Sequence, residues 1–233
     1  MVRYRSSGKS RKAVIAGLIN TIVSKKLGIV VCRPLVNIGR KRADYVYGAS
    51  DFVRVSSLEL VAHEIHTNNI SGNVAELGVF RGDFAKLINV SFPDRKLYLF
   101  DTFEGFDAKD VRIEGGKKSN VGDLSETSVE LVLNNMKFRE NCIVKKGYFP
   151  KTAEGLEDTF AFVSIDTDLY EPIYNGLCYF YPRLSKGGYL FVHDYNDGKI
   201  WTKAKEAVRK YCSENDINYF PLSDNYGSVV IMK

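Results

Sequence analysis

The sequence predicts an α/β fold, with a mostly parallel sheet of seven strands, helices on both faces and an antiparallel hairpin at the C-terminal end. Short β-branched or aromatic runs alternate with helical patterns along most of the chain, which is the rhythm of strand–helix–strand units. The last two runs are separated only by a short link rich in turn residues, which favours a hairpin.

The strands are predicted where these apolar runs fall between turn signals. In chain order they are Asn73–Leu77, Lys96–Phe100, Cys142–Lys145, Phe160–Ile165, Gly188–Val192, Ile217–Pro221 and Ser228–Met232. Helices are predicted where apolar residues recur at helical spacing. They are Leu58–His66, Phe84–Val90, Ser125–Met136, Glu171–Leu184 and Trp201–Cys212.

The positive charge of the chain lies at its N-terminal end. Residues 3–42 hold eleven basic and no acidic residues, whereas the remainder holds 22 basic and 28 acidic ones. We therefore expect residues 1–50 to form a basic arm and residues 51–233 to form the main domain. The apolar stretch Ala13–Val31 is interrupted by Lys25 and Lys26, so an amphipathic helix is expected there and not a membrane span.

The arm is expected to be a lid or an interaction element. Weak contact with a membrane surface is one role left open for it, while no specific nucleic-acid binding is expected. A homodimer is the assembly left open. The four cysteines form no C-x-x-C pair, so neither a zinc knuckle nor a disulfide framework is indicated, and a cytoplasmic location is expected.

A cofactor motif follows the first predicted strand, in the run V-A-E-L-G-V-F-R-G over residues 74–82. Gly78 allows a tight turn, and Gly82 opens the next helix without a side chain. Asp101 follows the second predicted strand at about the 20-residue spacing of a carboxylate that accepts hydrogen bonds from a ribose. The plainer alternative is that both glycines are turn residues and that Asp101 caps a loop.

Charge indicates which cofactor this turn would hold. Dinucleotide sites use G-x-G-x-x-G so that pyrophosphate can rest on backbone amides. Here the second close glycine is missing, and Glu76 is a poor neighbour for phosphate but a good one for an ammonium or a sulfonium. S-adenosylmethionine carries both cations and no phosphate, so it is the expected cofactor.

Acidic residues and a histidine follow two further strands. Asp166 and Asp168 come after the run Phe160–Ile165, and His193 and Asp194 after the run Gly188–Val192. Parallel strands end at one edge of a sheet, so these side chains are expected to converge. Carboxylates suit Mg²⁺, the expected ion, and an imidazole makes Mn²⁺ an alternative. The plainer reading is that the acids cap helices, as Asp168 is expected to do.

Over roughly residues 51–233 the chain resembles the macrocin O-methyltransferase (TylF-like) family. The ordered motifs are V-A-E-L-G-V-F-R-G, L-F-D-T-F-E-G-F, G-Y-F-P-K-T, I-D-T-D-L-Y-E-P and L-S-K-G-G-Y-L-F-V-H-D-Y. The resemblance implies the class I methyltransferase fold (Rossmann-like) and metal-dependent methylation of sugar hydroxyls. The chain departs from the family pattern at Thr167, usually glycine, and at His193, usually an acid.

The resemblance assigns roles to the residues already singled out. Those expected to contact the cofactor are Glu76, Gly78, Phe80, Gly82, Asp101, Thr102 and Asp166. Asp166 and His193 are the expected catalytic residues, and with Asp194 they are the expected metal ligands. The segment 102–124 is expected to be a mobile cover.

Two other functions stay open alongside methyl transfer to a sugar of a glycan or a glycosylated metabolite. The acceptor of an O-methyltransferase could be a phenol or a catechol, and nothing in the sequence excludes it. A non-catalytic nucleotide-binding module is the second alternative. A nicotinamide oxidoreductase is disfavoured by Glu76 and the missing glycine.

Overall fold

The computed structural model describes residue 26 and residues 38–115, 119–198 and 203–233. The chain divides into two compact units, residues 1–41 and 42–233. Most of the predicted arm lies outside the described residues, and so does the predicted helix over 13–31 apart from Lys26; both stay predictions. Within the described residues, no helix has the length and apolar character needed to cross a membrane.

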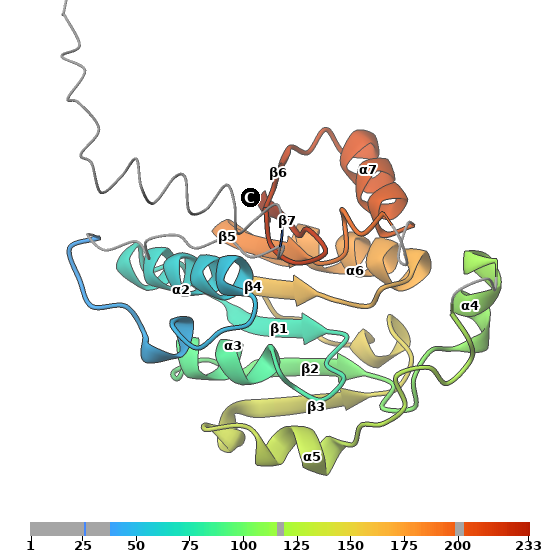
Figure 1. Cartoon of the computed structure of the whole chain (residues 1–233), viewed down its shortest axis with the longest axis horizontal. Coiled ribbons are helices and arrows are strands. Elements are labelled where there is room, and N and C mark those ends of the chain that lie inside the picture. Colours follow the sequence, from blue (N-terminus) through green and yellow to red (C-terminus); the bar gives the residue numbers. More distant parts are fainter. Residues whose placement is uncertain (1–25, 27–37, 116–118, 199–202) are drawn as a thin grey trace, which may run out of the picture. The chain divides into compact units, whose positions relative to one another are not determined.

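The second unit is built on a seven-stranded sheet in the order β3-β2-β1-β4-β5-β7-β6 (Figure 1). The strands are β1 (Asn73–Leu77), β2 (Leu97–Asp101), β3 (Cys142–Lys146), β4 (Phe160–Ile165), β5 (Leu184–Val192), β6 (Tyr219–Pro221) and β7 (Val229–Met232). β1 to β5 pair in parallel, whereas β7 runs antiparallel to β5 and β6. The predicted fold, including the closing hairpin, is confirmed.

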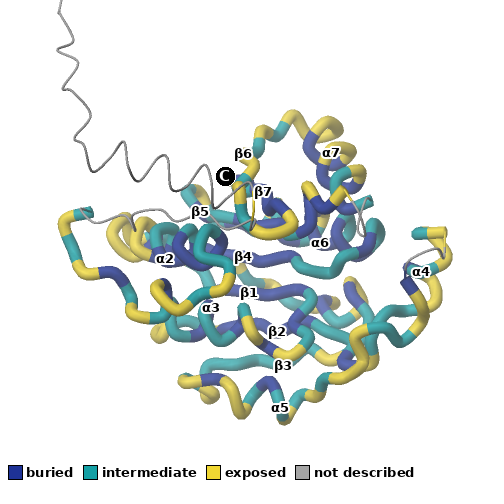
Figure 2. The backbone as a smooth tube through the Cα atoms, viewed as in Figure 1, coloured by how far each residue is buried: buried dark blue, intermediate teal, exposed yellow. Residues whose placement is uncertain are grey.

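Helices cover both faces of this sheet. They are α2 (Phe52–Thr67), α3 (Ala85–Ser91), α4 (Ala108–Glu114), α5 (Val129–Asn134), α6 (Tyr170–Arg183) and α7 (Ala204–Glu214), with short 3₁₀ turns η1 (Asp44–Val46), η2 (Arg139–Asn141) and η3 (Lys151–Ala153). α2, α3 and α5 pack on one face and α6 and α7 on the other, each over its own apolar core. The central strands β1, β2 and β4 are accordingly the most buried part of the unit (Figure 2).

Most element bounds differ from the predicted ones by one or more residues, and the local structure accounts for three of these differences. α5 begins at Val129 and not at Ser125, because the hydroxyl of Ser128 accepts a hydrogen bond from the amide of Leu131 and caps the helix there (3.1 Å). α2 begins at Phe52, ahead of the predicted start, because Asp51 caps it. β5 begins at Leu184, which pairs with β4 before a shift in register.

Candidate active site

The carboxyl ends of the central parallel strands lie at one level of the sheet. The last paired residues are Leu77 with Phe100, Leu77 with Ile165, and Ile165 with Val192. The ladder continues one residue further: the amide of Asp166 donates to the carbonyl of Leu77 (2.8 Å) and that of His193 to the carbonyl of Ile165 (2.9 Å). Side chains distant in the sequence therefore meet at this edge, as expected for parallel strands.

A cavity of about 580 Å³ opens at this edge of the sheet. The predicted site residues that line it are Glu76, Gly78, Phe80, Asp101, Thr102, Asp166, His193 and Asp194. Gly82 is not among the described residues that line the cavity. A Cβ at Gly82 would meet Val132 and Met136, each at 3.2 Å, so its missing side chain makes room for the packing of the α5 region.

Asp101 holds the turn after β1 in place. Its Oδ2 accepts hydrogen bonds from the amides of Val79 (2.7 Å) and Phe80 (2.8 Å), and its Oδ1 accepts one from the amide of Phe103 (2.7 Å). A carboxylate offers about four acceptor positions, so Asp101 can bind these amides and still accept from a ligand in the cavity.

Gly78 is required by the close approach of two strand ends. Its φ is +86°, and a Cβ there would lie 2.0 Å from the carbonyl oxygen of Asp166. The backbones of β1 and β4 thus pass within a distance that only glycine tolerates. This close approach puts the floor of the cavity between the turn after β1 and the acidic end of β4.

Glu76 has a buried carboxyl group with one unpaired oxygen. Its side chain lines the cavity, the residue is only 2% exposed, and its Oε2 has no hydrogen-bond partner among the described residues. Burial raises the pKa of Glu76 well above its ordinary value, although the nearby charge of Arg54 lowers it in part. A buried acid without a hydrogen-bond partner destabilises the fold unless a ligand supplies that partner, and a cation would supply it.

Asp166 lies between two basic side chains. Its Oδ2 accepts a hydrogen bond from Nη2 of Arg54 (2.8 Å), and its Oδ1 lies 3.1 Å from Nδ1 of His193. Burial favours the neutral acid, but these two charges lower the pKa of Asp166 well below its ordinary range. Burial likewise opposes a charged His193, but Asp166 raises the pKa of His193 to about 10. At neutral pH the imidazole is therefore charged in this arrangement.

Two more acids complete this cluster. Oδ2 of Asp194 lies 3.1 Å from Nδ1 of His193, and burial raises the pKa of Asp194. Burial together with the charges of Asp166 and Asp194 raises the pKa of Asp168 well above its ordinary value. The expectation that Asp168 caps the following helix is wrong, because the first amide of α6, on Tyr170, donates instead to Oε1 of Glu114 (2.7 Å).

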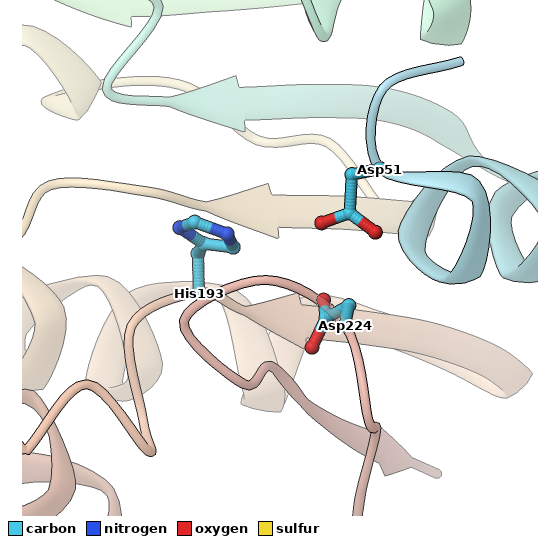
Figure 3. Close-up of side chains that lie close together, drawn as sticks. All are labelled: Asp51, His193 and Asp224. Atoms are coloured by element: carbon cyan, nitrogen blue, oxygen red, sulfur yellow. The ribbon is translucent and has the colours of Figure 1, made fainter. Parts of the chain in front are cut away.

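His193 also takes part in a second group with Asp51 and Asp224, whose side chains converge on it from the start of α2 and from the β6–β7 connection (Figure 3). Both carboxylates have structural partners. Asp51 accepts from the amides of Arg54 (3.1 Å) and Asn225 (3.0 Å), and Asp224 accepts from Ser228. This group ties the loop before β7 to the first turn of α2.

The segment over 102–124 contributes to the cavity from beyond the strand ends. It contains α4, which the sequence did not predict, and it lines the cavity with Gly105, Phe106, Asp107, Asp110 and Leu124. Tyr148 donates to Oδ1 of Asp110 (2.7 Å), so α4 is bonded to the segment after β3. That this segment moves as a cover stays a prediction.

Arg54 is the main cavity residue that the sequence did not single out. It lies in the first turn of α2, within the apolar run F-V-R-V that precedes the first strand. A single arginine inside an apolar helical run is the signal that could have indicated it, because such a charge needs a buried partner.

Known proteins match both this sequence and this fold. The sequence profile of the Macrocin-O-methyltransferase (TylF) family matches residues 39–227. The chain belongs to the TylF family. It is 28% identical over 178 residues to demethyldecarbamoylnovobiocin O-methyltransferase of Streptomyces niveus, covering 70% of this chain and 67% of that one.

One more relative and one solved structure are also similar to this chain. The chain is 24% identical to the 8-demethyl-8-(2,3-dimethoxy-alpha-L-rhamnosyl)-tetracenomycin-C 4'-O-methyltransferase of Streptomyces olivaceus, covering 84% of this chain and 78% of that one. Its fold matches the structure of the O-methyltransferase NovP with a TM-score of 0.65 at 25% identity, over 78% and 80% of the two chains. This TylF protein is thus an O-methyltransferase that uses S-adenosylmethionine, with the class I fold.

Proposed function

We propose that this TylF enzyme transfers the methyl group of S-adenosylmethionine to a hydroxyl of a sugar, in a glycan or a glycosylated metabolite. The observation that carries the proposal is one cavity with two unlike ends. The end of β1 presents an unpaired carboxyl oxygen at Glu76, and the ends of β4 and β5 present a charged cluster. The S. olivaceus relative, whose name describes a rhamnosyl substrate, supports the sugar acceptor.

The cofactor would lie along the turn after β1. Gly78 and Phe80 would border it, Asp101 and Thr102 would face its ribose, and the open oxygen of Glu76 would accept from its ammonium or face its sulfonium. Gly82 would act indirectly, through packing. Placement along this turn directs the methyl group towards Asp166.

The acceptor hydroxyl would lie beside Asp166 and His193. Asp166 is the ionised carboxylate there, so it would accept the hydroxyl proton or orient the hydroxyl towards the sulfonium. His193 keeps its own proton in this arrangement and would stabilise Asp166 in the charged form. We expect these residues to raise the rate mainly by positioning the acceptor, because methyl transfer needs the attacking oxygen in line with the sulfur–carbon bond.

The residues of the cluster fit a divalent ion. Asp166, His193 and Asp194 each offer a donor atom, and these atoms lie within 4.8 Å of one another. The buried Oδ2 of Asp194 lies 3.1 Å from Nδ1 of His193 but makes no hydrogen bond of good geometry among the described residues. These three side chains would hold Mg²⁺ or, because of the imidazole, Mn²⁺, and the imidazole would have to give up its proton to bind the ion. When bound, such an ion would lower the pKa of the acceptor hydroxyl.

Acceptor specificity provides the direct test of this function. The purified full-length protein would be incubated with methyl-labelled S-adenosylmethionine and, separately, with a rhamnosyl glycoside, a nucleotide-linked rhamnose and a catechol. Label transfer to a sugar hydroxyl is expected. Transfer to the catechol alone would establish a phenol methyltransferase instead, and cofactor binding without transfer to any acceptor would favour the non-catalytic alternative.

Glu76→Gln is expected to weaken S-adenosylmethionine binding while stabilising the cofactor-free protein. The pKa of Glu76 is raised in the folded state, so folding stability is fully present below the ordinary value of 4.5 and falls as the pH rises towards the raised value. Glutamine removes this loss, so the variant should gain stability on the order of 1–3 kcal/mol at pH 8 and little at pH 5.

Calorimetry and urea unfolding at both pH values measure these two effects. Cofactor affinity should fall by about tenfold or more, because the acceptor loses its charge. Exposed Glu140 supplies the matched control, since Glu140→Gln should change neither affinity nor pH dependence. If Glu76→Gln bound the cofactor as tightly as the unmodified protein, Glu76 would not be the cation-binding group.

A further inference from the structure

The guanidinium of Arg54 lies beside Asp166, one of the carboxylates of the candidate metal site. From the first turn of α2 the side chain reaches the end of β4, and its Nη2 lies 2.8 Å from Oδ2 of Asp166 and 3.5 Å from Oγ of Ser164. The guanidinium carbon lies 4.0 Å from the ring centroid of Phe84. Arg54 is only 8% exposed, so this is a nearly buried charge with a fixed location.

Asp166 is shared between this cation and the candidate metal ligands. Oδ2 of Asp166 accepts a hydrogen bond from Arg54, whereas Oδ1 of Asp166 lies 3.1 Å from Nδ1 of His193. The buried Nε of Arg54 has no hydrogen-bond partner among the described residues. The contact with Asp166 is therefore the main electrostatic anchor of the guanidinium, and the guanidinium is the nearest permanent positive charge to the cluster.

The surroundings keep Arg54 charged and in place. Burial opposes the charge, but Asp166, Glu76 and Asp224 together raise the pKa of Arg54 above its ordinary value. The backbone is held as well, because Asp51 accepts from the amide of Arg54 and is itself part of the group in Figure 3. A guanidinium does not lose its proton in proteins, so the protein carries this charge with or without a metal.

We propose that Arg54 is the built-in counter-cation of Asp166 and that it limits the affinity of the cluster for a divalent metal. The inference rests on the proposed function, since it concerns the same cluster. A divalent ion bound by Asp166, His193 and Asp194 would have to share the Asp166 carboxylate with Arg54. Like charges around one nearly buried carboxylate repel more strongly than they would in water, so the guanidinium weakens metal binding and supplies part of the charge that a metal would supply.

Three variants separate the charge of Arg54 from its hydrogen bond. Arg54→Met removes both, Arg54→Gln keeps a hydrogen-bond donor without the charge, and Arg54→Lys keeps the charge. The probe is Mn²⁺ alone, titrated into the full-length protein while the electron paramagnetic resonance signal of the free ion is followed. Met and Gln are expected to lower the dissociation constant by about tenfold to a hundredfold, and Lys by less than about threefold.

A matched control accounts for the change in net charge. Arg95 donates to the carbonyl of Gly72, before the start of β1, far along the strand from the cluster. Arg95→Met therefore removes one positive charge without touching Asp166, and Mn²⁺ affinity should stay unchanged. A gain equal to that of Arg54→Met would show a general charge effect and would overturn the proposal.

Thermal unfolding adds a readout that does not depend on activity. Arg54→Met leaves Asp166 without its nearest counter-charge, so the metal-free variant should melt at a lower temperature, and Mn²⁺ should raise its melting temperature more than that of the unmodified protein. If Arg54→Met does not fold, Arg54→Gln gives the same comparison of melting temperatures.

Several outcomes would overturn the proposal. The first is that the Met and Gln variants bind Mn²⁺ no more tightly than the unmodified protein. The second is that the Lys variant gains as much Mn²⁺ affinity as they do. The third is that no variant binds Mn²⁺. Failure of the proposed function would appear elsewhere, as absence of methyl transfer to every sugar by the unmodified protein, whatever the order of Mn²⁺ affinities.

Discussion

Asp166→Asn is expected to lower the turnover of methyl transfer by about 10²- to 10⁴-fold, the range for loss of a positioned acid–base group. The carboxylate is the ionised acid at the junction of the cofactor turn and the acceptor side, and asparagine keeps its size but neither its charge nor its basicity. S-adenosylmethionine affinity should change only a few-fold, because Glu76 and Asp101 remain. Steady-state kinetics with the best sugar acceptor and calorimetry with the cofactor measure the two quantities separately.

The control for this variant is an aspartate of the same unit far from the cavity. Asp94 is exposed just before β2, at the opposite end of the strand from Asp101, and Asp94→Asn should leave turnover unchanged. If Asp166→Asn reduced cofactor affinity as strongly as turnover, Asp166 would act mainly in cofactor binding. If turnover were unchanged, the acceptor would have to be activated by another group.

Gly78→Ala is expected to abolish measurable cofactor binding and to destabilise the fold by about 2–5 kcal/mol, because backbone strain and steric overlap act together. The added Cβ would lie 2.0 Å from the carbonyl oxygen of Asp166, which belongs to the backbone and cannot rotate away, and the φ of +86° disfavours any L side chain. β1 and β4 would have to separate at the floor of the cavity. Urea unfolding and calorimetry measure the two effects.

Gly155 provides a control that isolates the steric part. Its φ of +72° is in the same region, but a Cβ there meets nothing within 4 Å among the described residues. Gly155→Ala should therefore cost only the conformational strain, about 1–2 kcal/mol, and leave cofactor affinity intact. Equal losses for the two variants would mean that the close approach of β1 and β4 is not what requires glycine at position 78.

Local pattern was enough for the two strands that are buried along almost their whole length. Asn73–Leu77 and Phe160–Ile165 were predicted with the bounds that the structure has, because a strand buried on both faces is a mostly apolar run between turn residues. Parallel pairing then brings their ends to one edge, so the convergence of Asp166, His193 and Asp194 followed from the order of the strands alone.

Contacts across the fold could not be predicted in the same way. Asp168 stands at the right spacing to cap α6, yet the cap comes from Glu114, 56 residues before Tyr170, because α4 lies beyond the strand ends. Gly82 belongs to the cofactor motif by spacing, but its missing side chain makes room for Val132 and Met136. A one-dimensional pattern states which residue types occur near a turn and not which other elements approach it.

The fold class, the turn after β1 and the set of acidic strand ends were all determined by residue order, since hydrophobic period and glycine placement are local properties of a chain. Only the tertiary structure decided how those acids are paired. Arg54 reaches Asp166 across 112 positions of sequence, and Glu76 keeps an unpaired oxygen because no hydrogen-bond donor among the described residues reaches it. The interactions between charged side chains depend on their distances and burial in three dimensions, and local sequence determines neither.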